Sequence, residues 1–453
     1  MFSPKPRYRF YGTPHNYLTA ARHVVSSALS AATSDTDHVA MLEDRVASVV
    51  GVDHAIAVPQ ARFGIYLALR HMLKPGQRVL MSPYTIYDVV NMVLCAGGRP
   101  EFCDVDPATC NIDPAAVRAR LEECGSGGRA QDSDRDDSIG AVMVTHLHGL
   151  ACDIAPIAQL CAERGIPLIE DAAQAFGARV AGQHVGGIGD VGIYSFGRAK
   201  NINGFYGGMV VTRNHDLAAA VRAELAELPL EDSGKLAKRI AHCLVGDAMT
   251  VPAVFAPLTF RLFKLGAVNN VESVNKLVQT ENDPILRDTV PESYWRRMTP
   301  LQARVIYDQI FTVDAQTEVR AAYARRYHDG LQGLRGLVLP PLRDDRSHIY
   351  LQYPILVQAD NHGDGDGNRQ GHGAMGVGDR WDFVRYMMKN GRDVAIQHMT
   401  TASELSIFSD HRRDCPRARA VADSCVLLPT YPGYGMDQVE ANIAVMRRYF
   451  PPA

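Results

Sequence analysis

The chain has 453 residues, 46% of them hydrophobic, and a formal net charge of −3 at pH 7. This length exceeds the usual size of a single hydrophobic core, so two domains are expected. A charge this close to balance argues against a general nucleic-acid binder. The nine cysteines are an odd number with no CxxC pair, which is typical of reduced core thiols. The N-terminal residues lack the apolar core of a signal peptide, and together these features predict a cytoplasmic location.

Helical and strand patterns alternate along the first half of the chain. Apolar residues at helical spacing predict a helix over residues 38–50, and a short apolar run predicts a strand over residues 55–58. A second helix over residues 64–73 and a strand over residues 79–81 follow, and the alternation continues to residue 212. This order favours an α/β fold with a mostly parallel sheet and helices on both faces.

An apolar segment with basic flanks interrupts this pattern at about residues 235–265. Its central run, AMTVPAVFAPLTF, carries no charge, and Pro252 and Pro257 would break a straight helix. The run is shorter than the roughly 20 apolar residues that span a bilayer. Three interpretations stay open: a subunit-interface or core segment, a lid over a substrate, and a surface that touches a membrane or a lipid-linked substrate.

The last third of the sequence predicts a smaller α+β domain. An Arg-rich helix is expected over residues 313–332 and a strand over residues 350–357. The expected division is a large domain over residues 1–300, which contains the inserted apolar segment, and a small domain over residues 301–453.

Two polar, glycine-rich segments, residues 125–138 and 361–379, are expected to be surface loops. Neither can bury enough apolar surface to offset the entropy of ordering it. The second loop contains His362 and His372, but their spacing matches no metal-ligand pattern, and no metal site is predicted.

Two strand patterns are followed by residues that can carry chemistry. Asp171 directly follows the strand expected over residues 166–170, and Lys200 follows the strand expected over residues 191–196. Ligands of open α/β sheets bind at such strand ends. An amine and an acid together suggest pyridoxal 5′-phosphate (PLP), which forms a Schiff base with a lysine and needs an anion beside its ring nitrogen. The alternative is a loop lysine and a helix N-cap aspartate.

Two further residues fit the same cofactor. Gln174, one helical turn after Asp171, can donate a hydrogen bond to the PLP ring hydroxyl. Ser195 and nearby backbone N–H groups can hold the phosphate.

The chain resembles the DegT/DnrJ/StrS family of PLP-dependent sugar aminotransferases. The resemblance is carried by the segments IEDAAQAFGA and SFGRAKN around Asp171 and Lys200, and by four more at residues 99–113, 146–153, 297–303 and 427–433. It implies a fold type I PLP-transferase that works as a homodimer. It also implies transfer of an amino group from glutamate or glutamine to a keto-sugar, in most relatives a nucleotide-linked one. Because residue 200 is a lysine, the dehydrating relatives with a histidine there are disfavoured.

The resemblance also shows where this chain departs from the family. The usual phosphate-binding triplet is replaced by Gln60, Ala61 and Arg62, so that Arg62 either holds the phosphate or is a surface arginine. Ile86 stands where a ring usually stacks on the cofactor, with Tyr84 or Tyr87 as alternatives. Trp295 replaces an asparagine that crosses to the neighbouring subunit.

Three residues are candidate substrate contacts. His146 either faces the site or is a satisfied core histidine, and Arg297 either positions an anionic group or forms an interdomain salt bridge. His398 occupies a position where the family often has a histidine. Two other functions stay open: a PLP lyase or C–C bond-forming enzyme acting on a non-sugar substrate, and a PLP-binding regulatory protein without turnover.

Overall fold

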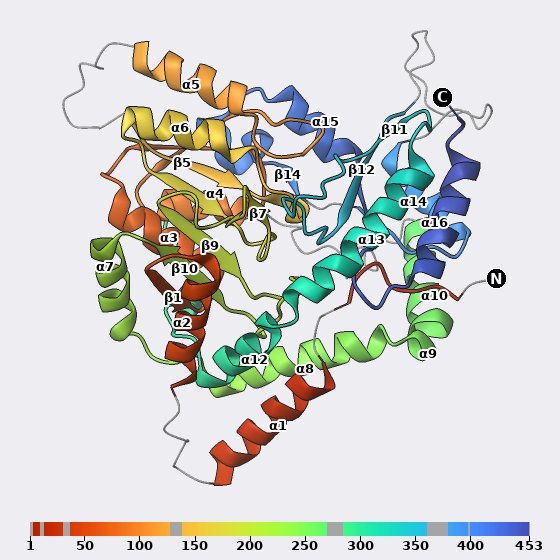
Figure 1. Cartoon of the computed structure of the whole chain (residues 1–453), viewed down its shortest axis with the longest axis horizontal. Coiled ribbons are helices and arrows are strands. Elements are labelled where there is room, and N and C mark those ends of the chain that lie inside the picture. The colour runs from red at the N-terminus through yellow and green to blue at the C-terminus, as the bar shows by residue number, and fades with distance from the viewer. Residues whose placement is uncertain are drawn as a thin grey trace.

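The larger of the two main sheets has seven strands in the order β1-β10-β9-β6-β5-β2-β4 (Figure 1). The computed structural model describes residues 3–9, 13–29, 37–126, 138–269, 284–359, 379–396 and 399–452. The strands are β1 His54–Val58, β2 Arg78–Met81, β4 Arg99–Phe102, β5 Ile139–Thr145, β6 Leu168–Asp171, β9 Val191–Ser195 and β10 Gly208–Thr212. Only β10 runs antiparallel to its neighbours in this sheet. The predicted mostly parallel sheet is therefore confirmed.

Helices cover both faces of this sheet, and the alternation of side chains in β1 shows why. Ile56 and Val58 belong to the core beneath α3, whereas Ala55 and Ala57 belong to the core beneath α2 on the opposite face. The helices of this part are α1 Pro14–Leu29, α2 His38–Val50, α3 Ala61–Met72, α4 Tyr87–Cys95, α5 Pro114–Ser126, α6 Ile154–Arg164, α7 His215–Ala226 and α12 Pro300–Ile310.

A second, antiparallel sheet is built from the last third of the chain in the order β11-β12-β15-β13. Its strands are β11 Leu337–Val338, β12 Tyr353–Val357, β13 Ala395–Ile396 and β15 Cys425–Leu428, and the helices of this region are α13 Val313–Leu331, α14 Arg380–Lys389, α15 Pro416–Ser424 and α16 Met436–Tyr449. Two short pairs complete the sheets: β3 Tyr84–Thr85 with β14 Thr400–Thr401, and β7 Arg179–Val180 with β8 Gln183–His184. The division into domains at residue 300 stays a prediction.

The expected strand over residues 350–357 begins three residues too early. Tyr350 has a φ of 49°, which is incompatible with a strand, and its N–H donates to Nδ1 of His348 at 3.0 Å. The expected helix over residues 64–73 begins earlier than predicted, at Ala61, because an apolar pattern does not mark a first helical turn that carries no capping side chain. The two expected glycine-rich loops lie almost entirely outside the described residues.

The apolar segment forms a bent pair of helices. α8 Ser233–Met249 lies along the bottom of the molecule, and after α9 Pro252–Val254 and a π-helical turn the chain continues as α10 Phe260–Asn269 beside the small sheet's helices (Figure 1). Phe255 and Phe260 are buried in the core of the small sheet, so part of this segment is a core element. Within the described residues no single helix is long and apolar enough to cross a membrane; only α8 taken together with residues 252–268 reaches that length and apolarity, with a bend of 64° between them.

Candidate active site

The acid predicted from sequence lies at the carboxyl end of a central strand. Asp171 is the last residue of β6 and is 5% exposed, and its side chain accepts a hydrogen bond from the N–H of Ala173 at 3.0 Å. Burial raises the pKa of Asp171 above its ordinary value, whereas that hydrogen bond and the nearby charge of Lys200 act in the opposite direction. Asp171 and Lys200 are therefore electrostatic neighbours, as the strand-end argument predicts.

Lys200 lies in a constrained loop between β9 and β10. The residue before it, Ala199, has a φ of 60°, which residues with a β-carbon rarely adopt. The loop is fixed from α12, where Gln309 accepts from the N–H of Asn203 at 3.0 Å and donates to its carbonyl oxygen at 2.9 Å. Asn201 donates to the carbonyl oxygen of Phe176 at 2.8 Å. These contacts hold the loop that presents the half-buried lysine.

Gln174 is oriented by a backbone contact. Its Oε1 accepts a hydrogen bond from the N–H of His148 at 2.9 Å, so its NH₂ group is the end that can donate to a ligand. This orientation agrees with the predicted role as a hydrogen-bond donor.

At the end of the site predicted to bind the phosphate, the N-terminus of α3 lies next to β9 and β10. Ser195, at the end of β9, is paired in register with Gly208 at the start of β10. A β-carbon on Gly208 would lie 2.6 Å from the backbone nitrogen of Ala61, the first residue of α3. The Gln60 side chain makes no capping hydrogen bond, so the first N–H groups of α3 are oriented toward this edge without a side-chain cap.

Arg62 contacts a neighbouring acid. Its guanidinium forms an ion pair with the buried carboxylate of Asp88 in the first turn of α4, and the hydroxyl of Tyr294 donates to the same carboxylate at 3.3 Å. The Arg62 side chain is 36% exposed, and its contact with the phosphate stays a prediction. No sequence motif links Arg62 and Asp88.

The candidate stacking residues differ in how deeply they are buried. Tyr84 is fully buried and paired through β3 with β14, so it cannot supply an exposed ring for a cofactor. Ile86 and Tyr87 are half-buried at the N-terminus of α4 and stay candidates. Trp295 packs edge-on against Phe63 of its own chain, with ring centroids 5.2 Å apart.

The three candidate substrate residues have different surroundings. His146 is fully buried, its Nε2 lies 3.0 Å from Glu170, and its Nδ1 accepts from the N–H of Cys152 at 3.0 Å. It is thus the satisfied core histidine, and neither ring nitrogen is left for a substrate. Arg297 is exposed and forms no ion pair within the described part of the chain, so the salt-bridge alternative is not supported. His398 lies outside the described residues.

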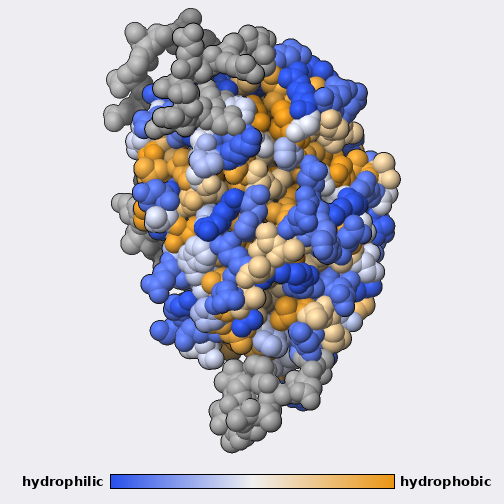
Figure 2. Space-filling view, turned by 90° about the vertical axis from the view of Figure 1, so that its left-hand side faces the viewer, coloured by the Kyte–Doolittle hydropathy of each residue, from blue (hydrophilic) through white to orange (hydrophobic). Residues whose placement is uncertain are grey.

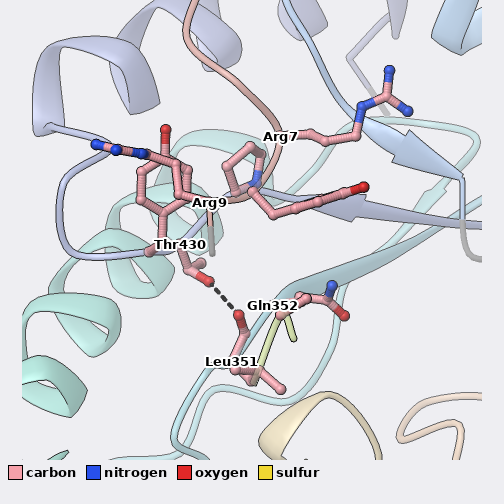
Figure 3. A pocket seen from close by; sticks show the side chains of 9 residues that line it. Arg7, Arg9, Leu351, Gln352 and Thr430 are labelled. Carbon is pink, nitrogen blue, oxygen red and sulfur yellow. Dashed lines mark hydrogen bonds between the residues drawn. The ribbon is translucent and has the colours of Figure 1, made fainter. Parts of the chain in front are cut away.

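A pocket that the sequence did not reveal opens beside the lysine loop. It is lined by residues of four distant segments: Arg7, Tyr8 and Arg9; Ala199; Leu351 and Gln352; and Pro429, Thr430 and Tyr431. Figure 3 shows the two arginines on one side of the pocket and Gln352 and Leu351 on the other, with the Thr430 hydroxyl donating to the Leu351 carbonyl. Arg7 is bound to Asp393, whereas Nε of Arg9 is buried without a partner among the described residues. Because the segments that line this pocket are far apart in the sequence, no local sequence pattern predicts it.

The fold has known counterparts. A crystal structure of a DegT DnrJ EryC1 StrS aminotransferase from Brucella abortus superposes with a TM-score of 0.69 at 20% identity, covering 96% of this chain and 95% of that one. The fold class is therefore that of fold type I aminotransferases. The family model of the DegT/DnrJ/EryC1/StrS aminotransferases matches residues 19–447, and the chain belongs to this family.

Two characterised relatives are similar over part of their length. GDP-perosamine synthase of Caulobacter vibrioides is 34% identical over 181 residues, which are 40% of this chain and 45% of that protein. A protein named pleiotropic regulatory protein, from Geobacillus stearothermophilus, is 34% identical over 188 residues, 41% of this chain and 47% of that protein. The chain thus spans less than half the length of each of these relatives.

Proposed function

We propose that this protein is a PLP-dependent aminotransferase that moves an amino group from glutamate or glutamine to a keto-sugar, most simply a nucleotide-linked one. The observation that carries the proposal is that Asp171 ends β6 and Lys200 follows the adjacent parallel strand β9, at the same carboxyl edge of the sheet. The uncapped N-terminus of α3 lies at the same edge, beside Gly208. Family membership and the similarity to GDP-perosamine synthase support the same activity and substrate class.

The residues fit PLP at four positions. Asp171 would face the ring nitrogen, the NH₂ of Gln174 the ring hydroxyl, and Ser195 with the N–H groups of Ala61 and its helix the phosphate. When bound to Lys200, PLP supplies an electron sink for the bond-breaking at the substrate's α-carbon.

Two residues have active roles in this proposal. Lys200 would hold the cofactor through its amine, and the same amine would move the proton that leaves the donor's α-carbon. Asp171 must be ionised to keep the ring nitrogen protonated, and its burial strengthens that interaction because the local dielectric constant is low. Arg9 and Gln352 line a small cavity beside Ala199, and these two side chains are proposed to contact the polar part of the substrate.

A lysine substitution tests this function. Lys200→Ala should abolish release of 2-oxoglutarate from glutamate, and borohydride should no longer fix the cofactor to the peptide that contains residue 200. Lys74→Ala, which changes an exposed lysine between α3 and β2, is the matched control and should keep full activity. Wild-type levels of transamination in Lys200→Ala would refute the proposal.

The two alternative functions differ in what happens to the amino donor. A lyase or C–C bond-forming enzyme would not convert glutamate to 2-oxoglutarate in amounts matching an aminated product. The name of the Geobacillus relative suggests a regulatory protein as the other alternative. Such a protein would convert no more than one equivalent of glutamate per chain to 2-oxoglutarate. A panel of keto-sugar nucleotides, cyclitol ketones and oxo acids, followed by mass spectrometry, separates these cases.

We also propose that the protein is a homodimer in the cytoplasm. Ile285 and Leu286 are 50% and 54% exposed, and Asn91 of α4 donates to the carbonyl oxygen of Ile285. On the side of the molecule shown in Figure 2, hydrophobic residues reach the surface in several groups among hydrophilic ones. All nine cysteines are free, which agrees with a reducing compartment.

Finally, we propose that the α8–α10 segment contacts an anionic membrane surface. Its exposed apolar side chains are Leu244, Val245, Val251, Leu258, Leu262 and Leu265, each at least 39% exposed. Lys235, Lys238, Arg261 and Lys264 flank them. An exposed apolar surface with basic flanks is the pattern of an interfacial contact, and it would bring the enzyme close to a lipid-linked substrate.

A further inference from the structure

Three potential metal ligands from distant parts of the chain meet in the protein core. Cys110 lies between β4 and α5, His148 lies in the turn Leu147–Gly149 after β5, and Cys425 is the first residue of β15. The two sulfur atoms and a ring nitrogen of His148 all lie within 4.8 Å of one another, and all three residues are buried. This Cys110–His148–Cys425 cluster shares no residue with the proposed cofactor site, although the N–H of His148 contacts Gln174.

The histidine of the cluster has no partner that explains its burial. His148 is 0% exposed, yet neither ring nitrogen makes a hydrogen bond of ordinary geometry with any residue of the described ranges. A buried polar group without such a bond costs stability. The backbone there is also strained, since His148 has a φ of 58° and Cys110 a φ of 61°. An additional ligand for the imidazole would account for both costs.

The cluster supplies two thiols and one imidazole from three separate segments of the chain. A cation that binds there can replace the proton of each thiol, because cysteine binds metals as the thiolate.

We propose that Cys110, His148 and Cys425 bind a single zinc ion. Two thiolates and one imidazole are the donor set that zinc prefers, whereas magnesium and calcium require oxygen ligands. Two negative sulfurs also neutralise one divalent cation, which a site with no exposed atom requires. The Tyr84 hydroxyl, which lies close enough to interact with the Cys425 sulfur, is available as a fourth donor.

The distances in the cluster agree with such a site. With zinc–sulfur and zinc–nitrogen bonds of about 2.3 and 2.0 Å, tetrahedral geometry places two donor atoms about 3.3–3.8 Å apart. Donors that already lie within 4.8 Å of one another can reach these separations through small side-chain movements. Binding displaces the thiol protons into solvent, so zinc binding is weakened at low pH.

Zinc at this position would join the two sheets next to the cofactor region. Cys425 begins a strand of the small sheet, whereas Cys110 and His148 follow strands of the large one. The N–H of His148 also donates to Gln174. The ion would thus fix the turn that orients Gln174, but the donor set alone carries the proposal, which does not depend on the proposed aminotransferase activity.

Metal analysis of the full-length protein tests the site. Protein produced with added zinc and purified without chelators should contain about one zinc per chain by inductively coupled plasma mass spectrometry. Cys110→Ser and Cys425→Ser should reduce this content at least tenfold. Cys103→Ser and Cys161→Ser, which change buried cysteines outside the cluster, are matched controls and should keep it.

A measurement on the wild type covers the case in which a cluster variant does not fold. Treatment with a mercurial reagent should release one equivalent of zinc to a colorimetric chelator, and a strong chelator should lower the melting temperature. Less than 0.1 equivalent of zinc, with a melting temperature that neither chelator nor added zinc changes, would overturn the proposal. Two thiols missing from a denatured, unreduced sample would show a Cys110–Cys425 disulfide instead and would equally overturn it.

Discussion

The buried carboxyl of Asp171 has opposite effects on the proposed activity and on the stability of the cofactor-free protein. Burial raises its pKa, so the charged form that the proposed cofactor needs is unfavourable in the cofactor-free fold. The folded pKa lies above the unfolded one, and the stability that the neutral form provides is therefore present at low pH and lost as the pH rises through the folded pKa.

The raised pKa of Asp171 predicts that one substitution lowers activity and raises stability. Asp171→Asn should lower transamination at least 100-fold, because a neutral amide cannot keep the ring nitrogen protonated. In the cofactor-free protein the same change should raise the melting temperature at pH 8 by a few degrees and have little effect near pH 4, as measured by calorimetry. A loss of stability at pH 8 would show that the carboxylate is compensated in the empty fold.

The pair of His146 and Glu170 is predicted to act on stability rather than on substrate binding. The Glu170 carboxylate accepts from the backbone N–H groups of Gly186, Ile188 and Gly189 at 2.6–2.7 Å, as well as contacting His146. Glu170→Gln replaces an acceptor by an NH₂ group that faces these donors. It should cost about 2–4 kcal/mol of unfolding free energy in urea.

Two comparisons make this result specific. The exposed Glu227→Gln should change the unfolding free energy by less than about 0.5 kcal/mol. The KM for the keto substrate should be the same in folded Glu170→Gln and wild type; a large rise in KM at unchanged stability would return His146 to the substrate site.

Arg9 is the pocket residue whose removal is expected to affect substrate binding. Its Nε is buried without a partner within the ranges that the structure describes, in a pocket that reaches Ala199 next to the lysine. Arg9→Ala should raise the KM for an anionic substrate about tenfold or more while kcat changes little, since a charge-assisted hydrogen bond is lost. Arg9→Lys should recover part of the affinity, and an unchanged KM in Arg9→Ala would remove the pocket from the substrate path.

At the scale of elements, the approach of the N-terminus of α3 to β10 requires a glycine at position 208. A β-carbon at Gly208 would lie 2.6 Å from the nitrogen of Ala61, and backbone atoms cannot yield as a flexible side chain can. Gly208→Ala should displace the N-terminus of α3 and weaken PLP binding at least tenfold in a fluorescence titration. Gly433→Ala, where the nearest atom would be 3.8 Å away, is the control and should bind PLP like wild type.

The α8–α10 segment gives a prediction in which the choice of residue matters. Leu258→Asp and Leu262→Asp change side chains that are 58% and 42% exposed, so they should abolish flotation with anionic liposomes and leave the melting temperature unchanged. Phe255→Asp changes a fully buried ring in the small-sheet core and should destabilise the protein instead. No lipid association of the wild type would remove the membrane proposal and leave the interface and lid interpretations.

At the scale of the whole molecule, the sequence predicted the sheet and the positions of Asp171 and Lys200. An apolar run that predicts a strand, and the residue directly after it, can be recognised locally in the sequence. Because ligands bind at the carboxyl ends of parallel strands, these residues are expected at one edge of the sheet. Arg62 was not predictable in the same way, because its partner Asp88 lies one helix further along. The pocket at Arg9 and the Cys110–His148–Cys425 cluster were missed for the same reason, since each joins segments hundreds of residues apart.

The proposed dimer is also a property of the whole molecule. Light scattering should give twice the mass of one chain, and Leu286→Arg, which places a charge on the exposed surface beside α4, should shift the protein toward the monomer. Leu18→Arg changes an equally exposed leucine on α1 and should leave the mass unchanged. A wild-type mass of one chain would refute the dimer.

The pocket beside Ala199 unites residues 7–9 with residues 429–431. On the ribosome, the first of these segments emerges more than 400 residues before the last. The sheet with Lys200 and Asp171 can therefore form while translation continues, whereas the cavity beside Ala199 is complete only after residues 429–431 have been added. If the proposed function holds, a nascent chain that is stalled before residue 429 would carry the lysine without the surface proposed to contact its substrate.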